Sequence, residues 1–337
     1  MIWYRFLACP YRSFMDNTPQ YINPIDDLNA AVDNPSSWLV DAFTVARSEG
    51  TVNVEGCDIQ FYQWGDSSKP SIVMMHGFLA HSGCWAFVAP FLTKNYHVVA
   101  FDFSGMGDSG WRDRYSDELR VKELMAVCDT TGLLDQANKP IVIAHSYGGR
   151  IAHQAVNAHV GKFDGMIICD LMIIRPSILL ANADKFAPPG NRSSSKPNRI
   201  YPDYNSAKQR FVLAPPQQVQ NSELFDFMAF HSLKEVDGGW QWKFDPKVFK
   251  REENLKHAVT EEGKWIVKTP GRKAMIYGVQ SKLFTKDSVN YMHELIAEAE
   301  CESFPMIEIP EAEHHLMLDQ PIAVTSALRS ILAFWNH

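Results

Sequence analysis

The strongest candidate for covalent chemistry in this sequence is Ser146, which follows a short apolar run. Residues 141–144 have the length and composition of a buried strand, and the residues after Ser146 have helical character. Ala144 and Gly148 stand two places before and after the serine. A strand that turns into a helix at one residue requires small flanking residues, and it projects the serine hydroxyl away from the sheet. We therefore predict that Ser146 is a nucleophile and that the N–H of Tyr147 faces the oxyanion formed by its attack.

A second motif, Met74-Met-His-Gly-Phe78, also follows a buried apolar run. A tight turn at this point places the N–H of Phe78 opposite that of Tyr147. Two such amides can hold the negative oxygen of a tetrahedral intermediate, so we expect them to form an oxyanion hole. His76, within the motif, is expected to be structural.

A candidate general base lies near the C-terminus, in the stretch Pro310–Pro321. This stretch holds two adjacent histidines, His314 and His315. A histidine on a loop that follows a strand can reach a serine at the same edge of the sheet and accept its proton. Because the two residues are neighbours, only one of them is expected to face Ser146.

These residues need a framework of strands and helices, and the apolar pattern supplies one. Short apolar runs alternate with amphipathic segments, which predicts a mostly parallel sheet covered by helices on both faces. The first two strands are expected to form an edge hairpin around Gly56. The predicted strands are Thr51–Glu55, Ile59–Trp64, Ser71–Met75, His97–Phe103, Ile141–Ala144, Met166–Cys169, Ala274–Gly278 and Pro305–Ile309. The predicted helices are Trp85–Leu92, Leu119–Val127, Ser288–Ala299 and Ile322–Trp335.

Two regions fall outside this alternation. Residues 1–45 are predicted to be an N-terminal extension over the surface, with a short helix near Ser37–Val45 and Met15 as an alternative start. Residues 171–270 interrupt the pattern after the sixth strand. Within them, Asn191–Lys196 is expected to be a loop that belongs to a lid. Trp240 and Trp242 are expected to pack this insertion rather than to bind a ligand.

The composition is that of an ordinary globular protein and excludes several classes. Of the 337 residues, 46% are hydrophobic and 21% are charged, and the formal net charge is -7. Nucleic-acid binders need a basic face, so this balance argues against one. No apolar stretch approaches the roughly 18 to 20 residues that span a bilayer. The six cysteines form no Cys-x-x-Cys pair. We expect a cytoplasmic protein with no metal, cofactor, nucleic-acid partner or membrane span, and we leave a homodimer open.

The segment Gly105-Met-Gly-Asp-Ser-Gly110 matches the dinucleotide-binding pattern G-x-G-x-x-G in letters only. That fingerprint requires a helix that opens at once, after the first strand of its domain. Here Trp111-Arg-Asp-Arg follows and several strands precede. We therefore do not predict a nucleotide site.

Taken in order, four motifs make the sequence resemble the α/β-hydrolase superfamily, in its capped serine-esterase-like branch. The motifs are His76-Gly77, Asp102-Phe-Ser-Gly-Met-Gly-Asp-Ser109, Ala-His-Ser146-Tyr-Gly-Gly, and a histidine seven residues before Pro321. The resemblance covers about residues 50–170 and 271–337. It implies a mostly parallel eight-stranded sheet with helices on both faces, a core of residues 46–170 and 271–337, and a mainly helical cap inserted at 171–270.

The same resemblance assigns roles to individual residues. It makes Ser146 the nucleophile and Phe78 and Tyr147 the oxyanion donors. His314 becomes the general base in preference to His315, because its distance from Pro321 matches the family pattern.

The acid of the triad is where this sequence departs from the family pattern. Many members carry it in a Gly-x-x-Asp motif after the seventh strand, but here that stretch is Gly278-Val-Gln-Ser281. A serine hydroxyl carries no negative charge with which to stabilise an imidazolium. Other branches place the acid after the sixth strand, where Asp170 ends this chain's run. We favour Asp170 and keep Asp287 as the alternative, and we interpret Asp108 as structural.

A serine at the turn, rather than an aspartate, favours acyl transfer over the chemistry of dehalogenases and epoxide hydrolases. We predict a carboxylesterase that acts on small or medium apolar esters through an acyl-enzyme, with His145 and Trp85 contacting the substrate. A lactonase, a thioesterase, an amidase, a C–C bond hydrolase or a perhydrolase of the same fold are alternatives. So is a non-catalytic receptor that binds a small ligand under the cap.

Overall fold

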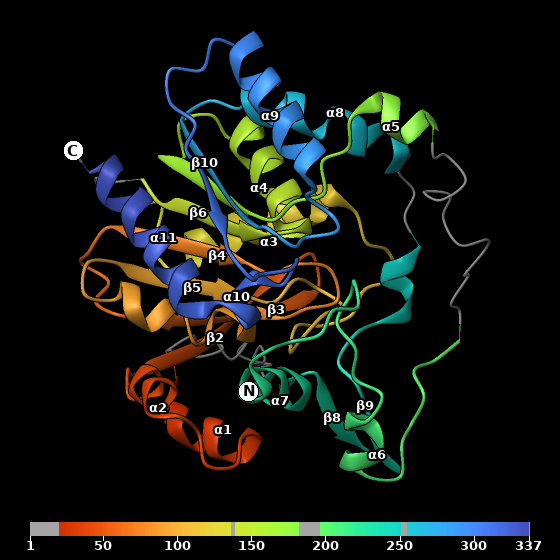
Figure 1. The fold of residues 1–337 in the computed structure, drawn as a ribbon. Coiled ribbons are helices and arrows are strands. Elements are labelled where there is room, and N and C mark those ends of the chain that lie inside the picture. The colour runs from red at the N-terminus through yellow and green to blue at the C-terminus, as the bar shows by residue number, and fades with distance from the viewer. Residues whose placement is uncertain (1–19, 136–138, 182–195, 251–254, 337) are drawn as a thin grey trace, which may run out of the picture.

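The computed structural model describes residues 20–135, 139–181, 196–250 and 255–336 (Figure 1). Met15 and residues 191–195 of the predicted lid loop lie outside these ranges. Within them, no helix is long and apolar enough to cross a bilayer.

Nine strands form one mixed sheet in the order β1-β2-β3-β5-β4-β6-β7-β10-β11. The strands from β5 to β11 pair in parallel, and β1, β2, β3 and β5 pair antiparallel. Their bounds are β1 (Gln20–Ile22), β2 (Arg47–Val54), β3 (Cys57–Trp64), β4 (Ser71–Met75), β5 (His97–Phe101), β6 (Ile141–His145), β7 (Gly165–Cys169), β10 (Arg272–Gly278) and β11 (Met306–Ile309). All eight predicted strands are present, and the predicted α/β-hydrolase fold is confirmed. The ninth, β1, forms the edge, so the prediction of β2 and β3 as edge strands was wrong.

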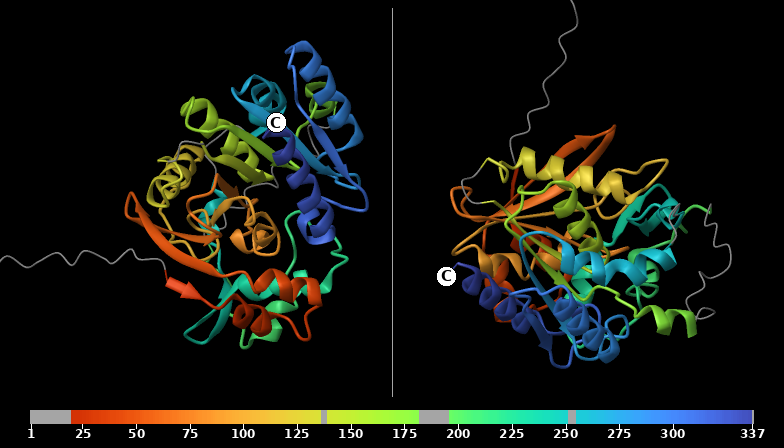
Figure 2. Two further views of the ribbon diagram at one scale, coloured as in Figure 1. Left: turned by 90° about the vertical axis from the view of Figure 1, so that its left-hand side faces the viewer. Right: turned by 90° about the horizontal axis from the view of Figure 1, so that it is seen from above.

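Helices cover both faces of the sheet (Figure 2). Successive residues of a strand point to opposite faces. Ile72 and Met74 of β4 therefore join one core and Val73 and Met75 the other, all four fully buried. The first core includes α2 (Ser37–Phe43) and α11 (Pro321–Trp335). The second includes α3 (Asp117–Thr130), α4 (Tyr147–Ala158), α8 (Leu255–Lys268) and α9 (Lys286–Glu298). Burial on both faces explains the continuous apolar runs of the central strands.

The predicted helix over Trp85–Leu92 was wrong. The chain forms two short 3-10 turns instead, η1 (Ser82–Trp85) and η2 (Ala89–Leu92). Pro90 has no N–H to donate and its ring clashes with the preceding turn, so an α-helix does not continue through it. The apolar residues of this segment other than Phe91 are nevertheless buried.

The N-terminal extension is more structured than predicted. It contains α1 (Pro24–Ala31) besides α2, and α1 lies against α7 (Ser222–His231) (Figure 1). Phe43 of α2 is buried and meets Phe227 of α7 edge to face, with ring centroids 5.2 Å apart. This part of the extension therefore packs against residues from the predicted cap.

The predicted cap region, residues 171–270, splits into two parts. The described elements up to residue 250 are α5 (Pro176–Ala181), α6 (Tyr204–Lys208), α7, a hairpin of β8 (Leu233–Val236) and β9 (Gly239–Trp242), and η3 (Pro246–Phe249). The last helix, α8, packs instead with α4 and α9 on one face of the sheet (Figure 1). We use the name insertion segment for residues 196–250 and propose that the cap ends before α8.

The loop at Gly105–Gly110 forms turns, and the next helix begins only at Asp117. Gly107 has φ +59, and a Cβ there would lie 2.2 Å from Oδ2 of Asp102. The Asp102 carboxylate accepts hydrogen bonds from the N–H groups of Ser82 at 2.7 Å and Asp108 at 2.8 Å. The glycines thus let the loop wrap a buried carboxylate.

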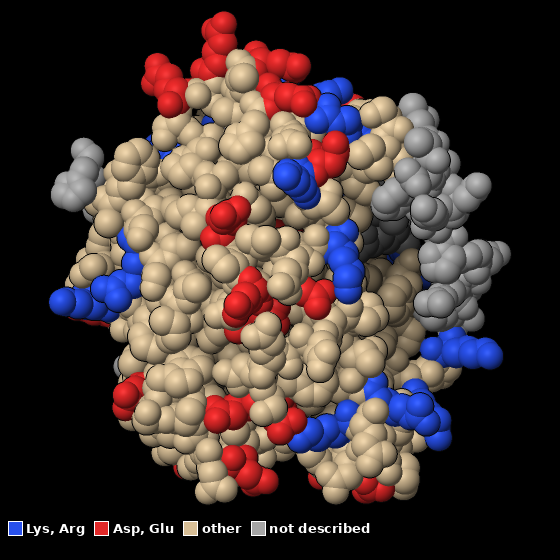
Figure 3. Space-filling view, in the orientation of Figure 1, with Lys and Arg blue, Asp and Glu red and all other residues tan. Residues whose placement is uncertain are grey.

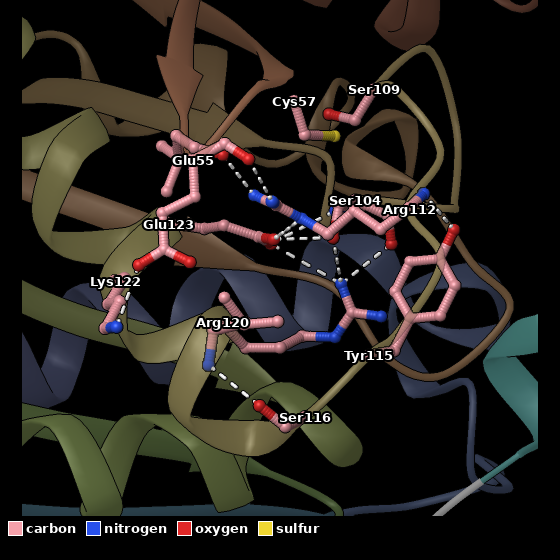
Figure 4. Close-up of polar contacts among 12 residues, drawn as sticks. Glu55, Cys57, Ser104, Ser109, Arg112, Tyr115, Ser116, Arg120, Lys122 and Glu123 are labelled. Atoms are coloured by element: carbon pink, nitrogen blue, oxygen red, sulfur yellow. Dashed lines mark hydrogen bonds and ion pairs between the residues drawn. The ribbon is translucent and has the colours of Figure 1, made fainter.

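A buried ion cluster supports this loop from beneath (Figure 4). Glu123 of α3 is fully buried and accepts hydrogen bonds from the backbone and hydroxyl of Ser104. Arg112 and Arg120 contact the same carboxylate at 3.2 and 3.4 Å. Moving any of these partners away would leave a buried charge uncompensated, which is strongly destabilising. The cluster therefore fixes the path of the chain between β5 and α3.

On the face shown in Figure 3, acidic side chains gather at the top, over α9, and a smaller basic group lies at the lower right, over α6 and the β8–β9 hairpin. Most of the remaining face is uncharged, with acidic and basic side chains scattered over it. This view contains no continuous basic stripe of the kind that tracks a nucleic-acid backbone.

Candidate active site

Ser146 is the single residue between β6, which ends at His145, and α4, which begins at Tyr147. Its φ of 50° and ψ of -120° are sparsely populated for a residue with a side chain. Its N–H donates to the carbonyl of Cys169 on β7 at 2.9 Å, and its own carbonyl accepts from the N–H of Gly149 at 2.8 Å. The strained turn is therefore held by the neighbouring strand and by the first turn of the helix.

The small residues around Ser146 are required by close approach of the backbone. A Cβ on Gly148 would lie 2.8 Å from the carbonyl oxygen of His76. A Cβ on Gly149 would lie 2.7 Å from Cγ2 of Ile168. A Cβ on Gly77, in the turn after β4, would lie 3.2 Å from Cβ of Ser146. These contacts place the two motifs that were predicted to form the site directly against each other.

His314 lies on the loop between β11 and α10 (Leu316–Asp319) and is 2% exposed. Its Nε2 is 2.9 Å from Oγ of Ser146, and its Nδ1 is 2.7 Å from Oδ1 of Asp170. Because an ionised carboxylate only accepts, Nδ1 carries the proton in this arrangement and Nε2 is left to accept the serine hydroxyl. The three predicted catalytic residues form one hydrogen-bonded chain.

Asp170 directly follows β7, has φ 50° and is fully buried. Its Oδ2 accepts from the N–H of Gly278 at 2.9 Å, and its Oδ1 accepts from Oγ of Ser281 at 2.7 Å as well as from His314. Its own N–H donates to the carbonyl of Ile276 at 2.8 Å. These donors offset the cost of burying a carboxylate.

We predicted no role for Ser281 from the sequence. It stands at the place of the acid in the family's Gly-x-x-Asp motif, and we interpreted it only as a missing acid. In the structure it is 6% exposed and donates to Asp170, and its hydroxyl also accepts from the N–H groups of Leu283 and Phe284 at 3.2 and 3.1 Å. The sequence did contain a signal for this role. A polar residue stands at the motif position of the acid, and the neighbouring strand ends in a carboxylate, that of Asp170.

The structure does not bring the alternative acid into this chain of contacts. Asp287 lies in the first turn of α9, its side chain is 40% exposed, and it contacts Arg175 at 3.5 Å. Asp108, which we interpreted as structural, pairs with Lys243 at 2.6 Å. Neither carboxylate is paired with His314 in the described contacts.

The predicted oxyanion residues flank Ser146 on both sides. Phe78 follows β4 in the turn that contacts Ser146, and Tyr147 is the first residue of α4, where backbone N–H groups point out of the helix. Their rings meet edge to face with centroids 5.9 Å apart. The hydroxyl of Tyr147 donates to Oδ1 of Asp117 at 2.7 Å, which ties the start of α4 to α3.

His145 and His315 surround the ring of His314, with centroids 4.7 and 5.0 Å away. Nε2 of His145 faces the carbonyl oxygen of His314 at 2.9 Å, so this nitrogen carries the proton and donates. Burial, with the neighbouring histidines, holds the pKa of His145 well below its usual range, and burial lowers the pKa of His315 to about 3. Both rings are therefore neutral at pH 7. His145 lines the adjoining cavity, as expected of a substrate-binding residue.

Trp85, the other predicted substrate-binding residue, is placed differently. It is fully buried in the core that contains α2 and α11 and is not among the residues that line the cavity. We predicted Trp85 within a helix over Trp85–Leu92; in the structure it ends η1, and its side chain belongs to this core.

A cavity of about 260 Å³ is lined in part by residues adjacent in sequence to Ser146 and His314. Phe78, His145 and His315 line it beside Ser146, and most of the remainder is apolar. Trp242 packs against Tyr201 and Phe211, as predicted for the insertion, and it also lines this cavity. The side chains supplied by the insertion segment and α10 are Arg210, Phe211, Val212, Leu213, Ala214, Met228, Ser232, Trp242, Lys243, Phe244, Met317 and Leu318.

The residues described contain no group of three or more His, Cys, Asp or Glu side chains arranged to hold a metal ion. His314 is engaged with Asp170 and Ser146, and His145 with the backbone carbonyl of His314. The contacts from Ser146 through His314 to Asp170 are of the kind that can activate a serine hydroxyl.

A model of the "Alpha/beta hydrolase family" matches residues 72–328. The serine hydrolase-like protein of Danio rerio is 23% identical over 302 residues, which cover 85% of this chain and 89% of that protein. Monoacylglycerol lipase ABHD6 of Rattus norvegicus is 28% identical over 167 residues, which cover 49% of this chain and 45% of that protein.

Solved structures share the fold at low sequence identity. An esterase of M. tuberculosis has a TM-score of 0.66 at 19% identity and covers 92% of this chain and 97% of its own. The thioesterase domain from the curacin biosynthetic pathway has a TM-score of 0.65 at 20% identity, with 84% and 99% covered.

Proposed function

Since the chain belongs to the α/β-hydrolase family, we propose that it is a serine hydrolase that cleaves carboxylic esters through an acyl-enzyme. The observation that carries this proposal is the hydrogen-bonded chain from Oγ of Ser146 through His314 to Asp170, with distances of 2.9 and 2.7 Å. A buried acid, an imidazole and a serine at a strained turn make up the arrangement that activates a hydroxyl at neutral pH.

The first half of the reaction forms the acyl-enzyme. Oγ of Ser146 attacks the ester carbonyl carbon while its proton passes to Nε2 of His314. The buried Asp170 carboxylate stabilises the imidazolium that results, and the N–H groups of Phe78 and Tyr147 donate to the oxyanion. The tetrahedral intermediate then collapses. His314 gives its proton to the leaving alcohol as the bond from carbon to that oxygen breaks.

The second half repeats these steps with water. The oxygen of a water molecule attacks the acyl carbon while His314 accepts a proton from that water. His314 then returns the proton to Oγ of Ser146 as the carboxylic acid leaves. The neutral ring of His145 donates to the carbonyl of His314 throughout, which supports the position of the base. No step requires a cofactor.

The apolar cavity supports an ester with an apolar acyl chain as the substrate class. Relatives of this chain carry the name monoacylglycerol lipase, which makes a monoacylglycerol the natural first substrate to assay beside simple aliphatic esters.

Labelling with a fluorophosphonate probe tests the proposal, because such probes react only with an activated serine. We expect rapid labelling of the wild type and none of Ser146→Ala. Ser330→Ala is the matched control, since that hydroxyl lies exposed on α11 and donates to a helix carbonyl at 2.9 Å; its labelling should equal that of the wild type. A folded wild type that fails to label would contradict the activated serine and favour a receptor that binds ligand without turnover.

A further inference from the structure

A second cavity of about 430 Å³ lies behind the first and shares a wall with it. His81 and Lys243 line both cavities. Two residues adjacent in sequence line different cavities: Gly107 lines the first cavity and Asp108 lines the second. The two spaces are therefore separated by little more than one layer of side chains.

The position of this wall follows from the order of the strands. Ser146 follows β6, Phe78 follows β4 and Gly107 belongs to the loop after β5, and these three strands are neighbours in the order β5-β4-β6. The first cavity thus begins beside Ser146 and ends at His81 and Lys243. The second cavity lies further along the sheet, where β2 and β3 supply part of its lining.

The two cavities differ in chemistry. The first is mostly apolar, whereas carboxylates and cations line the second, among them Arg47, Glu49 and Asp108. Arg47 pairs with Asp27, and burial together with the nearby Asp27 and Asp108 raises the pKa of Glu49. An alkyl chain gains free energy by leaving water for the first cavity, and it gains much less in a space that must keep charged groups solvated.

Contacts from both the core and the insertion segment hold the wall. Nζ of Lys243 lies 2.6 Å from Oδ1 of Asp108, with the lysine side chain 15% exposed. The hydroxyl of Tyr62 donates to Oδ2 of Asp108 at 3.3 Å. His81 is 5% exposed, and its Nδ1 accepts from the N–H of Gly83 at 3.1 Å. The lysine directly follows β9 and the aspartate lies in the loop after β5, so the pair joins the insertion segment to the core.

We propose that the Lys243–Asp108 pair and His81 set the longest acyl chain that the site accepts. This inference rests on the proposed function. The proposal assigns the acyl chain, rather than the alcohol, to the first cavity, which is lined by Phe78 and His145 beside the proposed oxyanion hole. Acyl chains that fit within this cavity of about 260 Å³ are accepted, and longer chains meet the ion pair.

The test is a chain-length profile of kcat/KM with p-nitrophenyl esters from acetate to palmitate, measured below their solubility limits. In the wild type we expect a rise of about fourfold per methylene up to the length that fills the cavity, then a fall. In Lys243→Ala the ratio of activity on the C14 ester to that on the C8 ester should increase at least tenfold. Asp108→Ala, which releases the lysine from the core side, should change the ratio in the same direction.

Lys247→Ala is the matched control. Lys247 comes from the same segment and also joins it to the core, through Asp113 at 2.8 Å, but it lines neither of the two cavities. Its chain-length profile should coincide with that of the wild type. A second series with a constant butyryl group and lengthening alcohols should show no shift in Lys243→Ala.

Unchanged ratios in both Lys243→Ala and Asp108→Ala would overturn the inference, and so would an equal shift in Lys247→Ala. Turnover of the short esters by the wild type distinguishes this outcome from failure of the proposed function. If the short esters react and the profiles of all variants coincide, the esterase proposal stands and the wall does not set chain length.

Discussion

The two sides of the candidate site are held in different ways. On the core side, Ser146 and Asp170 each follow a buried parallel strand directly, and each N–H donates to a carbonyl of the next strand, Cys169 at 2.9 Å and Ile276 at 2.8 Å. In the insertion segment, Phe211 of the loop after α6 and Trp242 of β9 meet each other with ring centroids 5.9 Å apart. The core side is fixed by the backbone ladder of the sheet, whereas the insertion side is fixed by side-chain packing.

This difference separates the residues proposed to carry out catalysis from those proposed to select the substrate. Residues that exchange protons must be held within tenths of an ångström, which strand ends with paired backbone groups provide. Residues that select an acyl chain need only exclude water and present the correct shape. We therefore expect changes on the core side to reduce kcat strongly, and changes in the insertion segment to alter preferences among substrates.

The largest effect is expected from His314→Ala on the core side. Loss of the base leaves Ser146 without a proton acceptor, and kcat should fall by about four to six orders of magnitude while KM changes little. Steady-state kinetics with a p-nitrophenyl ester of medium chain length measure this. A loss of less than tenfold would remove His314 from the proposed mechanism.

Acid should weaken the fold through histidines buried near the site. Burial lowers the pKa of His76 to about 3, of His81 to about 4 and of His315 to about 3, against about 6.5 in the unfolded chain. At a pH between the folded and the unfolded pKa values, the unfolded chain binds more protons at these histidines than the folded chain does. The free energy of unfolding should therefore fall as the pH drops below about 6.5, by about 1.4 kcal/mol per pH unit for each histidine.

Urea unfolding at pH 7.5, 6.0 and 5.0 measures this dependence. His315→Gln should give a slope shallower by about one proton, because one buried group that must stay neutral has been removed. A free energy of unfolding that does not change over this range would contradict the burial of these rings.

Ser281→Ala tests the support of the acid. The variant loses the hydroxyl that donates to Oδ1 of Asp170 at 2.7 Å. Because hydrogen bonds to charged groups contribute about 1.5 to 3 kcal/mol, kcat should fall by about 10-fold to 100-fold. Ser281→Thr retains the hydroxyl and should restore most of the activity. If both variants are equally impaired, the hydroxyl is not what supports Asp170.

The smallest effect is expected from Gln217→Ala in the insertion segment. Gln217 accepts the N–H of His315 at 2.8 Å and donates to Oδ2 of Asp319 at 2.9 Å, so it joins this segment to the loop of the base. Loss of these contacts should reduce kcat by only a few-fold. The exposed Gln209, changed to alanine, is the control. A loss above 100-fold would show that the insertion segment helps to position the base.

Much of the core side was predictable because its signals are local. The apolar runs gave the bounds of β4, β6 and β7 to within a residue, and the small residues around Ser146 marked the turn. The placement of Asp170 needed one more consideration, the order of strands, which brings the ends of β6, β7 and β10 together. The helix predicted at Trp85 failed because apolar spacing alone does not register the effect of Pro90.

The insertion segment was less predictable because its contacts link residues far apart in sequence. Nothing near Gln217 indicates that it binds His315, and nothing near Lys243 indicates Asp108 as its partner. The strand β1 was missed for a similar reason: a three-residue strand is too short to show a period, and it forms by pairing with β2.

The most direct test of the account is the identity of the acid, measured as kcat/KM for Asp170→Asn and Asp287→Asn on one ester. Asp170 is buried against Nδ1 of His314 at 2.7 Å, whereas Asp287 is half exposed on α9 beside Arg175. We predict a loss of about 10⁴-fold for Asp170→Asn, because asparagine cannot stabilise the imidazolium, and a change of less than twofold for Asp287→Asn. Wild-type activity in Asp170→Asn, or a large loss in Asp287→Asn alone, would contradict the account.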